Sequence, residues 1–156
     1  MSPALFLDVA LAPALRLLPA RMDSPEARAM LVSIALQESQ LKARRQHGEG
    51  PARSYLQFER TGIRGVLTHH TTSVEAGRIC VLVDVEATVP AVYRAIEFHD
   101  PLAVCFARLL LWTLPDFLPG RADAQMAWEQ YIRAWNPGRP RRETWDANFR
   151  QAWNLV

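Results

Sequence analysis

Hydrophobic residues recur every three or four positions through most of the chain, which is the period of an α-helix. The first such segment spans residues 3–18, where Pro13 predicts a kink or a break. Its expected apolar positions are Leu5, Val9, Leu15 and Leu18. A second helix is predicted to begin at Ser24, which can cap it, and Pro25, which suits the first helical position, and to run to about Ser39.

The remaining chain continues this pattern after a loop marked by glycine and proline at 48–51. Residues 53–59 alternate in polarity, which predicts a short strand or an extended segment. Thr72 and Glu75 have the spacing of a capping box that opens a further helix. More helices are predicted at 90–98, from His99-Asp100-Pro101 through the apolar run that follows, at 122–135 and at 141–154. The sequence therefore predicts a mainly α fold in one domain, residues 1–156.

Composition narrows this picture only slightly. The 156 residues include 49% hydrophobic and 22% charged residues, which is typical of a folded globular domain and not of a disordered chain. A net charge of +2 does not by itself argue for binding to nucleic acid. Cys80 and Cys105 lie in apolar runs and are expected to be buried, reduced thiols. Asp8 and Arg16 interrupt the N-terminal apolar run, so neither a signal peptide nor membrane insertion is expected, and synthesis is expected in the cytoplasm.

A carboxyl group lies on the apolar stripe of the second helix, close to its end. The stripe is formed, at offsets of four, three and four, by Ala27, Leu31, Ile34 and Glu38. The helix dipole and the apolar neighbours both disfavour ionisation there, so the pKa of Glu38 is expected to be raised. A general acid that works near neutral pH needs this property. The alternative is that Glu38 ends the helix and reaches water.

The segment that contains Glu38, "ALQES", and the later segment "GPARSYLQFE" together resemble a motif of the lysozyme-like superfamily, in the branch of soluble lytic transglycosylases and phage endolysins. In that family a catalytic Glu followed by Ser ends a helix, and a segment ending in a hydrophobic residue and Gln comes later. Glu38, Ser39 and Gln57 match this pattern. The resemblance covers residues 24–66, and a weaker one covers 125–153, where Tyr131 and Asn136 are candidates for the late cleft residues.

The sequence departs from the family pattern at two points. Ser54 replaces a family glycine, and Tyr131 and Asn136 are five residues apart where the family has an Ala-Tyr-Asn turn. The resemblance implies an α+β lysozyme-like domain with a short extended segment beside a cleft. It also implies cleavage of the MurNAc–GlcNAc β-1,4 bond of peptidoglycan by a muramidase or lytic transglycosylase, of phage or prophage origin. Such a protein would act on the cell wall, in the periplasm, or be carried in a phage particle.

Site residues follow from the same resemblance. The expected catalytic residues are Glu38 and Glu59, and the expected substrate-binding residues are Ser39, Ser54, Tyr55, Gln57, Tyr131 and Asn136. Trp135 is added from its own position, beside Asn136-Pro137-Gly138 at a helix end, where aromatic residues can line a cleft. In a transglycosylase Glu38 alone would act as acid and then as base, with Glu59 orienting the sugar. In a hydrolase the two carboxylates would work together. The alternative for Glu59 is a salt bridge with Arg44, Arg45 or Arg60. No metal and no cofactor are expected.

Other readings stay open. The main alternative is a non-catalytic protein of a phage particle or of its assembly, which has the same fold but has lost activity. The replacement of a family glycine by Ser54 motivates this alternative. Aromatic stripes at Trp128–Trp135 and Trp145–Trp153 are more typical of a core than of a sugar platform. Two arginine clusters could attract an anionic wall polymer or nucleic acid, or could simply favour solubility: Arg44, Arg45 and Arg53, and Arg139, Arg141 and Arg142.

Overall fold

The segment that begins at Ser24 becomes the central helix, α3 (Pro25–Ser39), in the computed structural model, which describes residues 1–45, 48 and 50–156. The Ser24 hydroxyl accepts a hydrogen bond from the Ala27 backbone N–H at 3.2 Å, as the capping signal predicts. The helix is buried at every position from Ala29 to Gln37, so other helices surround it. It ends at Gln40, whose φ of 52° is left-handed.

The N-terminal segment is helical throughout but has an unexpected register. It consists of α1 (Pro3–Phe6), a π-helical stretch (Leu7–Leu11) and α2 (Ala12–Leu17). The Ala12 N–H bonds to the Leu7 carbonyl, five residues back, so the helix has a wider, π-helical turn just before Pro13 and does not break there.

Two of the four positions predicted to form the buried apolar face of this segment are exposed. Leu15 and Leu18 are buried, but Leu5 and Val9 are 48% and 47% exposed. The buried face continues instead through Phe6, Ala10, Leu11 and Ala14. Small alanines at two of these positions let the segment pack closely on its neighbours, and they carry a weak hydrophobic signal in the sequence.

The later helices lie close to their predicted places. They are α5 (Ser73–Leu82), α6 (Val89–Ala95), α7 (Asp100–Trp112), α8 (Ala124–Trp135) and α9 (Arg142–Trp153). His99 caps α7, with its Nδ1 accepting from the Leu102 N–H at 3.1 Å. The capping box at α5 does not form, because the Thr72 hydroxyl donates to the Val66 carbonyl at 2.8 Å instead.

One helix had no counterpart in the sequence prediction: α4 (Arg60–Thr68). Its glycines, Gly62 and Gly65, disfavour helix and hide it. A Cβ atom at Gly62 would lie 3.3 Å from the Phe58 ring, so a larger residue there would require that ring to shift slightly. Gly65 has open space beside it.

The segment predicted to be extended, residues 53–59, is a tight turn closed by one antiparallel bridge. Arg53 and Phe58 exchange backbone hydrogen bonds of 2.9 and 2.7 Å, and Arg53 also pairs with Arg45. These isolated bridges are all the β structure in the described part of the chain, which is mainly α and contains no sheet. Ser54 and Gln57 adopt left-handed φ values of 67° and 49° within the turn.

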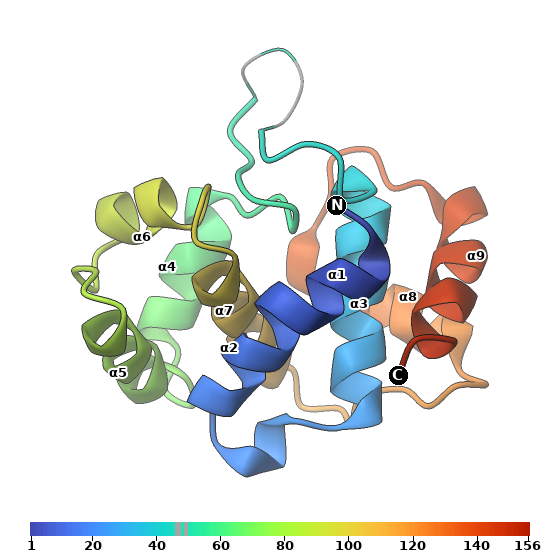
Figure 1. Cartoon of the computed structure of the whole chain (residues 1–156), viewed down its shortest axis with the longest axis horizontal. Coiled ribbons are helices and arrows are strands. Elements are labelled where there is room, and N and C mark those ends of the chain that lie inside the picture. Colours follow the sequence, from blue (N-terminus) through green and yellow to red (C-terminus); the bar gives the residue numbers. More distant parts are fainter. Residues whose placement is uncertain (46–47, 49) are drawn as a thin grey trace.

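Figure 1 shows how the helices divide around the centre. α4, α5 and α6 gather on one side and α8 and α9 on the other, with α3 and α7 between them. α3 packs mainly against α9, and α7 packs against α2, α4 and α5. Within the described ranges no helix is both long enough and apolar enough to cross a bilayer.

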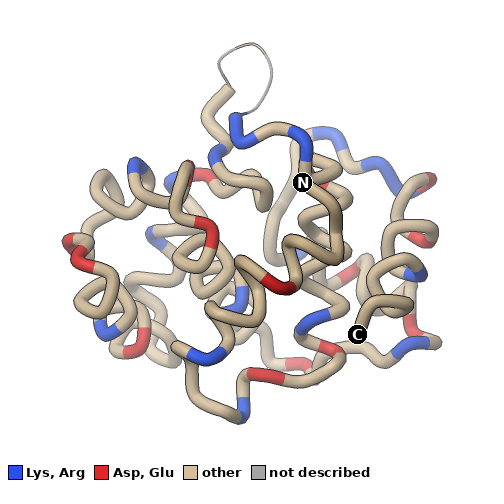
Figure 2. Tube along the Cα trace, viewed as in Figure 1, with Lys and Arg blue, Asp and Glu red and all other residues tan. Residues whose placement is uncertain are grey.

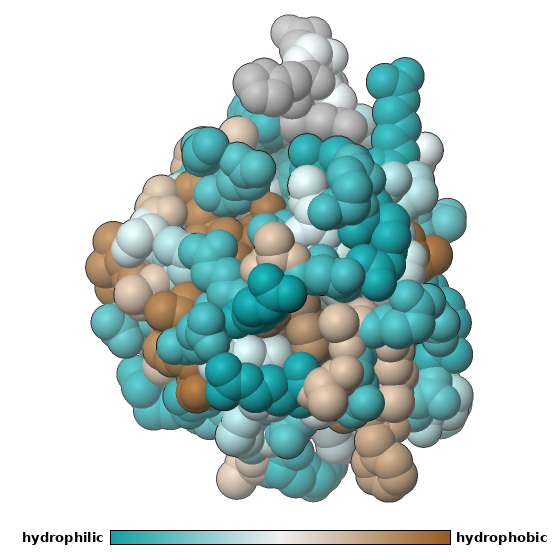
Figure 3. Space-filling model, turned by 90° about the vertical axis from the view of Figure 1, so that its right-hand side faces the viewer, coloured by the Kyte–Doolittle hydropathy of each residue, from teal (hydrophilic) through white to brown (hydrophobic). Residues whose placement is uncertain are grey.

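Charged positions lie mostly on the outside. Several Lys and Arg positions follow the loop after α3 and the connection from α8 to α9, at the top of Figure 2. The side of the molecule that faces the viewer in Figure 3 is mostly hydrophilic, with hydrophobic residues in smaller patches.

Candidate active-site groove

An open groove of about 870 Å³ lies where the end of α3 meets the turn at 53–58. One wall is formed by the turn and the first half of α4, including Gln57, Glu59 and Gly65. The other wall is formed by the end of α8 and the connection to α9, residues 131–141. Glu38 also lines the groove, from the last turn of α3.

The carboxyl group of Glu38 is partly buried and accepts a hydrogen bond from a tyrosine. The Tyr131 hydroxyl donates to Glu38 Oε1 at 2.6 Å. Burial raises the pKa of Glu38 from 4.5 to about 7, although the bond from Tyr131 and the positive charge of Arg141 act in the opposite direction. The negative charge of Glu59 adds slightly to the rise. Near neutral pH this carboxyl group is therefore poised between its acid and base forms.

Tyr131 is fixed by the aromatic core between α8 and α9. Its ring stacks on Trp145 with centroids 5.0 Å apart and lies 5.4 Å from Trp128. Burial raises the pKa of the Tyr131 hydroxyl, so that group keeps its proton and acts as the donor. The second aromatic stripe is core as expected, since Trp145, Phe149 and Trp153 are all buried.

Trp135 and Asn136 both line the groove at the end of α8. The Trp135 indole N–H donates to the Leu56 carbonyl at 2.8 Å, and its ring lies 5.6 Å from that of Phe58. This contact joins α8 to the turn on the opposite wall. Asn136 ends the helix in a left-handed conformation, φ 46°.

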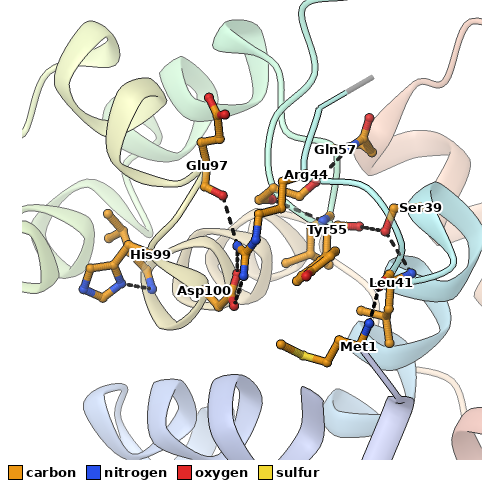
Figure 4. A network of polar contacts seen from close by, with 12 residues as sticks. Met1, Ser39, Leu41, Arg44, Tyr55, Gln57, Glu97, His99 and Asp100 are labelled. Atoms are coloured by element: carbon orange, nitrogen blue, oxygen red, sulfur yellow. Dashed lines mark hydrogen bonds and ion pairs between the residues drawn. The ribbon is translucent and has the colours of Figure 1, made fainter. Parts of the chain in front are cut away.

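Three of the expected substrate-binding residues lie outside the groove lining, namely Ser39, Ser54 and Tyr55. The Ser39 hydroxyl donates to the Tyr55 carbonyl at 2.7 Å and accepts from the Leu41 N–H at 3.1 Å (Figure 4). Ser54 is buried, and its hydroxyl accepts from the Leu56 N–H at 3.1 Å. Ser39 thus holds the turn against the end of α3, and Ser54 stabilises the turn internally. Of the polar residues 53–57 that were expected to bind substrate, Gln57 is the one that lines the groove.

Arg44 stacks on the face of the Tyr55 ring, with the guanidinium carbon 4.3 Å from the ring centroid. Arg44 also forms an ion pair with both oxygens of Asp100, which ties the loop after α3 to α7 (Figure 4). Neighbouring Arg45 pairs with buried Glu97, which Arg53 also approaches at 3.4 Å. Two of the arginines considered for Glu59 are thus engaged with other carboxylates.

Glu59 precedes α4 and is exposed on the groove wall. Within the described residues it forms no ion pair of 4 Å or less, so the structure does not provide the salt bridge considered as its alternative. Among the described residues two carboxyl groups therefore line the groove, that of Glu38, which is partly buried, and that of Glu59, which is exposed.

Among the groove residues that were not predicted as site residues, Gln37 and Arg141 bond to each other. The Gln37 amide donates to the Arg141 carbonyl at 2.8 Å, and the Arg141 guanidinium donates back to the Gln37 carbonyl at 2.8 Å. Thr144 and Asn148 of α9 complete the bonds of the Gln37 side-chain oxygen. The partners are more than a hundred residues apart, so no local pattern could reveal them.

Over the ranges that the structure describes, no three His, Cys, Asp or Glu side chains are placed to hold a metal ion. Cys80 and Cys105 are free and buried, as expected. No protein-family model matches the chain, and no curated protein and no solved structure shows significant similarity to it.

Proposed function

We propose that this protein is a peptidoglycan-cleaving glycosidase with a lysozyme-like fold, which cuts the MurNAc–GlcNAc β-1,4 bond with Glu38 as its general acid. The observation that carries the proposal is a carboxyl group whose pKa is raised to about 7, on the wall of an open groove. A side chain that donates a proton near neutral pH must keep it in the resting state, and burial supplies that condition.

The hydrogen bond from Tyr131 suggests how the acid is oriented. Because Tyr131 donates to Oε1, Oε2 is the oxygen left to carry the proton. Transfer of that proton to the glycosidic oxygen breaks the bond between this oxygen and C1 of the muramic sugar. The resulting Glu38 carboxylate is stabilised by the Tyr131 hydroxyl and by the charge of Arg141, the two influences that lower its pKa.

The second step requires a base. In a transglycosylase the Glu38 carboxylate takes the proton of the sugar's own C6 hydroxyl as that oxygen bonds to C1, and an anhydro ring closes. In a hydrolase a water molecule supplies the oxygen, and exposed Glu59 is the group available to take its proton. Gln57, Trp135 and Asn136 are the groove residues proposed to orient the sugars.

The main test compares Glu38→Gln with the wild type on purified cell walls. We expect the variant to remain folded by circular dichroism and to lose at least about a hundredfold of the clearing rate, because general acid catalysis contributes that much or more. Glu26→Gln, at the opposite end of the same helix, is the matched control and should retain activity. Undiminished clearing by Glu38→Gln would refute the proposal.

Product analysis then separates the two reactions. Mass spectrometry of digested peptidoglycan would show reducing ends after hydrolysis and 1,6-anhydro ends after transglycosylation. If the products are reducing ends, Glu59→Gln should be strongly impaired. If they are anhydro ends, Glu59→Gln should retain most of its activity.

The alternative, an inactive lysozyme-fold protein of a phage particle, was motivated by Ser54 in place of a family glycine. Ser54 adopts a φ of 67°, the conformation that glycine favours, and its side chain is buried outside the groove lining. The substitution therefore does not narrow the groove. A wild type without activity on walls from several bacteria would still favour this alternative.

A further inference from the structure

One wall of the groove carries positive charge that the described residues leave largely uncompensated. Three arginines line this wall: Arg133, Arg139 and Arg141. Arg133 is neutralised by an exposed ion pair with Asp116. The other two belong to the connection between α8 and α9, which runs along the groove from Asn136 to Arg141.

Of Arg139 and Arg141, Arg139 makes fewer contacts with other described residues. It is exposed, and within the described residues its side chain makes no hydrogen bond or ion pair. Gly138 directly precedes Arg139 and Pro140 directly follows it. Pro140 fixes its own backbone φ, so it restricts one side of the segment that presents Arg139.

Arg141 lies closer to the acid. Its guanidinium donates to the Gln37 carbonyl at 2.8 Å, which is a neutral acceptor, and its charge acts on Glu38. Burial raises the pKa of Glu38 and so favours its neutral form, which compensates the charge of Arg141 less than a free carboxylate would. In the described part of the chain, Glu59 on the opposite wall is the other carboxylate that lines the groove.

We infer that Arg139 and Arg141 form a carboxylate-binding subsite, and that the groove selects a β-1,4-linked glycan carrying carboxylates over a neutral one. This inference rests on the proposed sugar-cleaving function and specifies its substrate. Guanidinium groups bind carboxylates through paired, charge-assisted hydrogen bonds. Glu59 repels the same carboxylate from the other wall, so the glycan is held with its charged substituents toward the α8–α9 connection.

The carboxylate has two possible sources on a wall glycan. A bare strand presents the lactyl carboxylate of its muramic sugars, whereas a strand with stem peptides presents peptide carboxylates and has its lactyl groups blocked as amides. Both offer the same chemistry to an arginine pair. Binding should therefore be compared for a bare strand, for a strand with stem peptides, and for a chitin oligomer of equal length, which has no carboxylate.

Binding is best measured by calorimetry in the Glu38→Gln background, in which no substrate is turned over. We expect at least one carboxylate-bearing strand to bind roughly five- to tenfold more tightly than chitin at low salt, and this preference to decrease as salt is added. Adding Arg139→Gln should remove most of the preference and leave chitin binding unchanged. The strand that responds identifies the source of the carboxylate.

Two further variants separate specific recognition from general charge. Arg139→Lys keeps the charge but loses the fork, so it should recover only part of the preference. Arg16→Gln removes the same charge from α2, outside the groove, and should change nothing. Arg141→Gln should also reduce the preference, with its folding checked by melting temperature because of its bond to Gln37.

Equal binding of chitin and both charged strands, or a preference that survives Arg139→Gln and Arg141→Gln, would overturn the subsite and leave the proposed function standing. A protein that binds none of the three glycans would overturn both.

Discussion

At the scale of single residues, the pKa of Glu38 reflects opposing influences. Removal from water raises it, and the hydrogen bond from Tyr131 together with the charge of Arg141 lowers it. The resulting pKa of about 7 depends on each of these contributions. Changing one partner should therefore move the pH at which the acid loses its proton, without removing the acid itself.

Replacing Tyr131 by Phe removes the hydrogen bond to Glu38 and keeps the ring that stacks on Trp145. Because the lost bond favours the carboxylate, the pKa of Glu38 should rise further, by roughly one unit if the bond contributes about 1.4 kcal/mol. The alkaline limb of the pH–rate profile for wall cleavage should move up by the same amount.

Tyr93→Phe provides the matched control for this experiment. The Tyr93 hydroxyl donates to the Pro51 carbonyl and does not contact Glu38, so its loss should leave the pH profile in place. An unshifted profile for Tyr131→Phe would mean that Glu38 is not the acid that the profile reports.

At the scale of elements, the groove depends on how the end of α3 is joined to the turn at 53–58. Ser39 makes this junction, because its hydroxyl bonds both the Tyr55 carbonyl and the Leu41 N–H. Trp135 makes a second junction, from α8 to the Leu56 carbonyl. The groove walls belong to segments far apart in sequence, and these bonds set their relative positions.

Ser39→Ala should lower the free energy of unfolding by about 1–2 kcal/mol, since two backbone groups at a partly buried junction lose their partner. It should also reduce kcat, because the turn that carries Gln57 is no longer fixed against Glu38. Urea denaturation and wall-cleavage rates provide the measurements.

Ser33→Ala, in the middle of the same helix, is the appropriate comparison. The Ser33 hydroxyl is buried but bonds only the Ala29 carbonyl within α3. Its loss should cost less than the loss of Ser39 and leave kcat unchanged. Equal effects of the two substitutions would show that the junction does not position the groove.

At the scale of the whole molecule, a shielded acid makes folding depend on pH. The pKa of Glu38 is about 7 in the folded protein and near 4.5 in the unfolded chain. Between these values the folded state holds the extra proton, so the free energy of unfolding decreases as pH rises, and the loss is complete above pH 7.

We expect this effect to lower the free energy of unfolding by up to about 3 kcal/mol between pH 4.5 and 8. Glu38→Gln should remove that decrease, whereas Glu26→Gln should retain it. Urea titrations at several pH values provide the test. The pKa of Asp23 is lowered by its bond with Arg28, and this opposite contribution is lost only below the chosen range. A wild type as stable at pH 8 as at pH 5 would mean that Glu38 is not shielded from water.

Sequence by itself determined the features that local chemistry controls. Ser24 with Pro25, and His99 with Asp100 and Pro101, mark helix starts because capping groups act within one turn. Spacing along the helix also placed Glu38 on the buried face of α3 and near its end, where its pKa is raised. The mainly α character followed from the same periodicity.

Only the tertiary structure decided which distant groups meet. Tyr131 reaches Glu38 across 93 residues, and Gln37 reaches Arg141 across 104. Ser39, expected to bind substrate, instead bonds a carbonyl sixteen residues away. The helix α4 was also missed by the sequence prediction, since Gly62 and Gly65 disfavour helix locally, and only the packed structure places Gly62 against the Phe58 ring. Periodicity and caps describe the neighbours of a residue along the chain, whereas its partners across a groove are set by how whole helices pack.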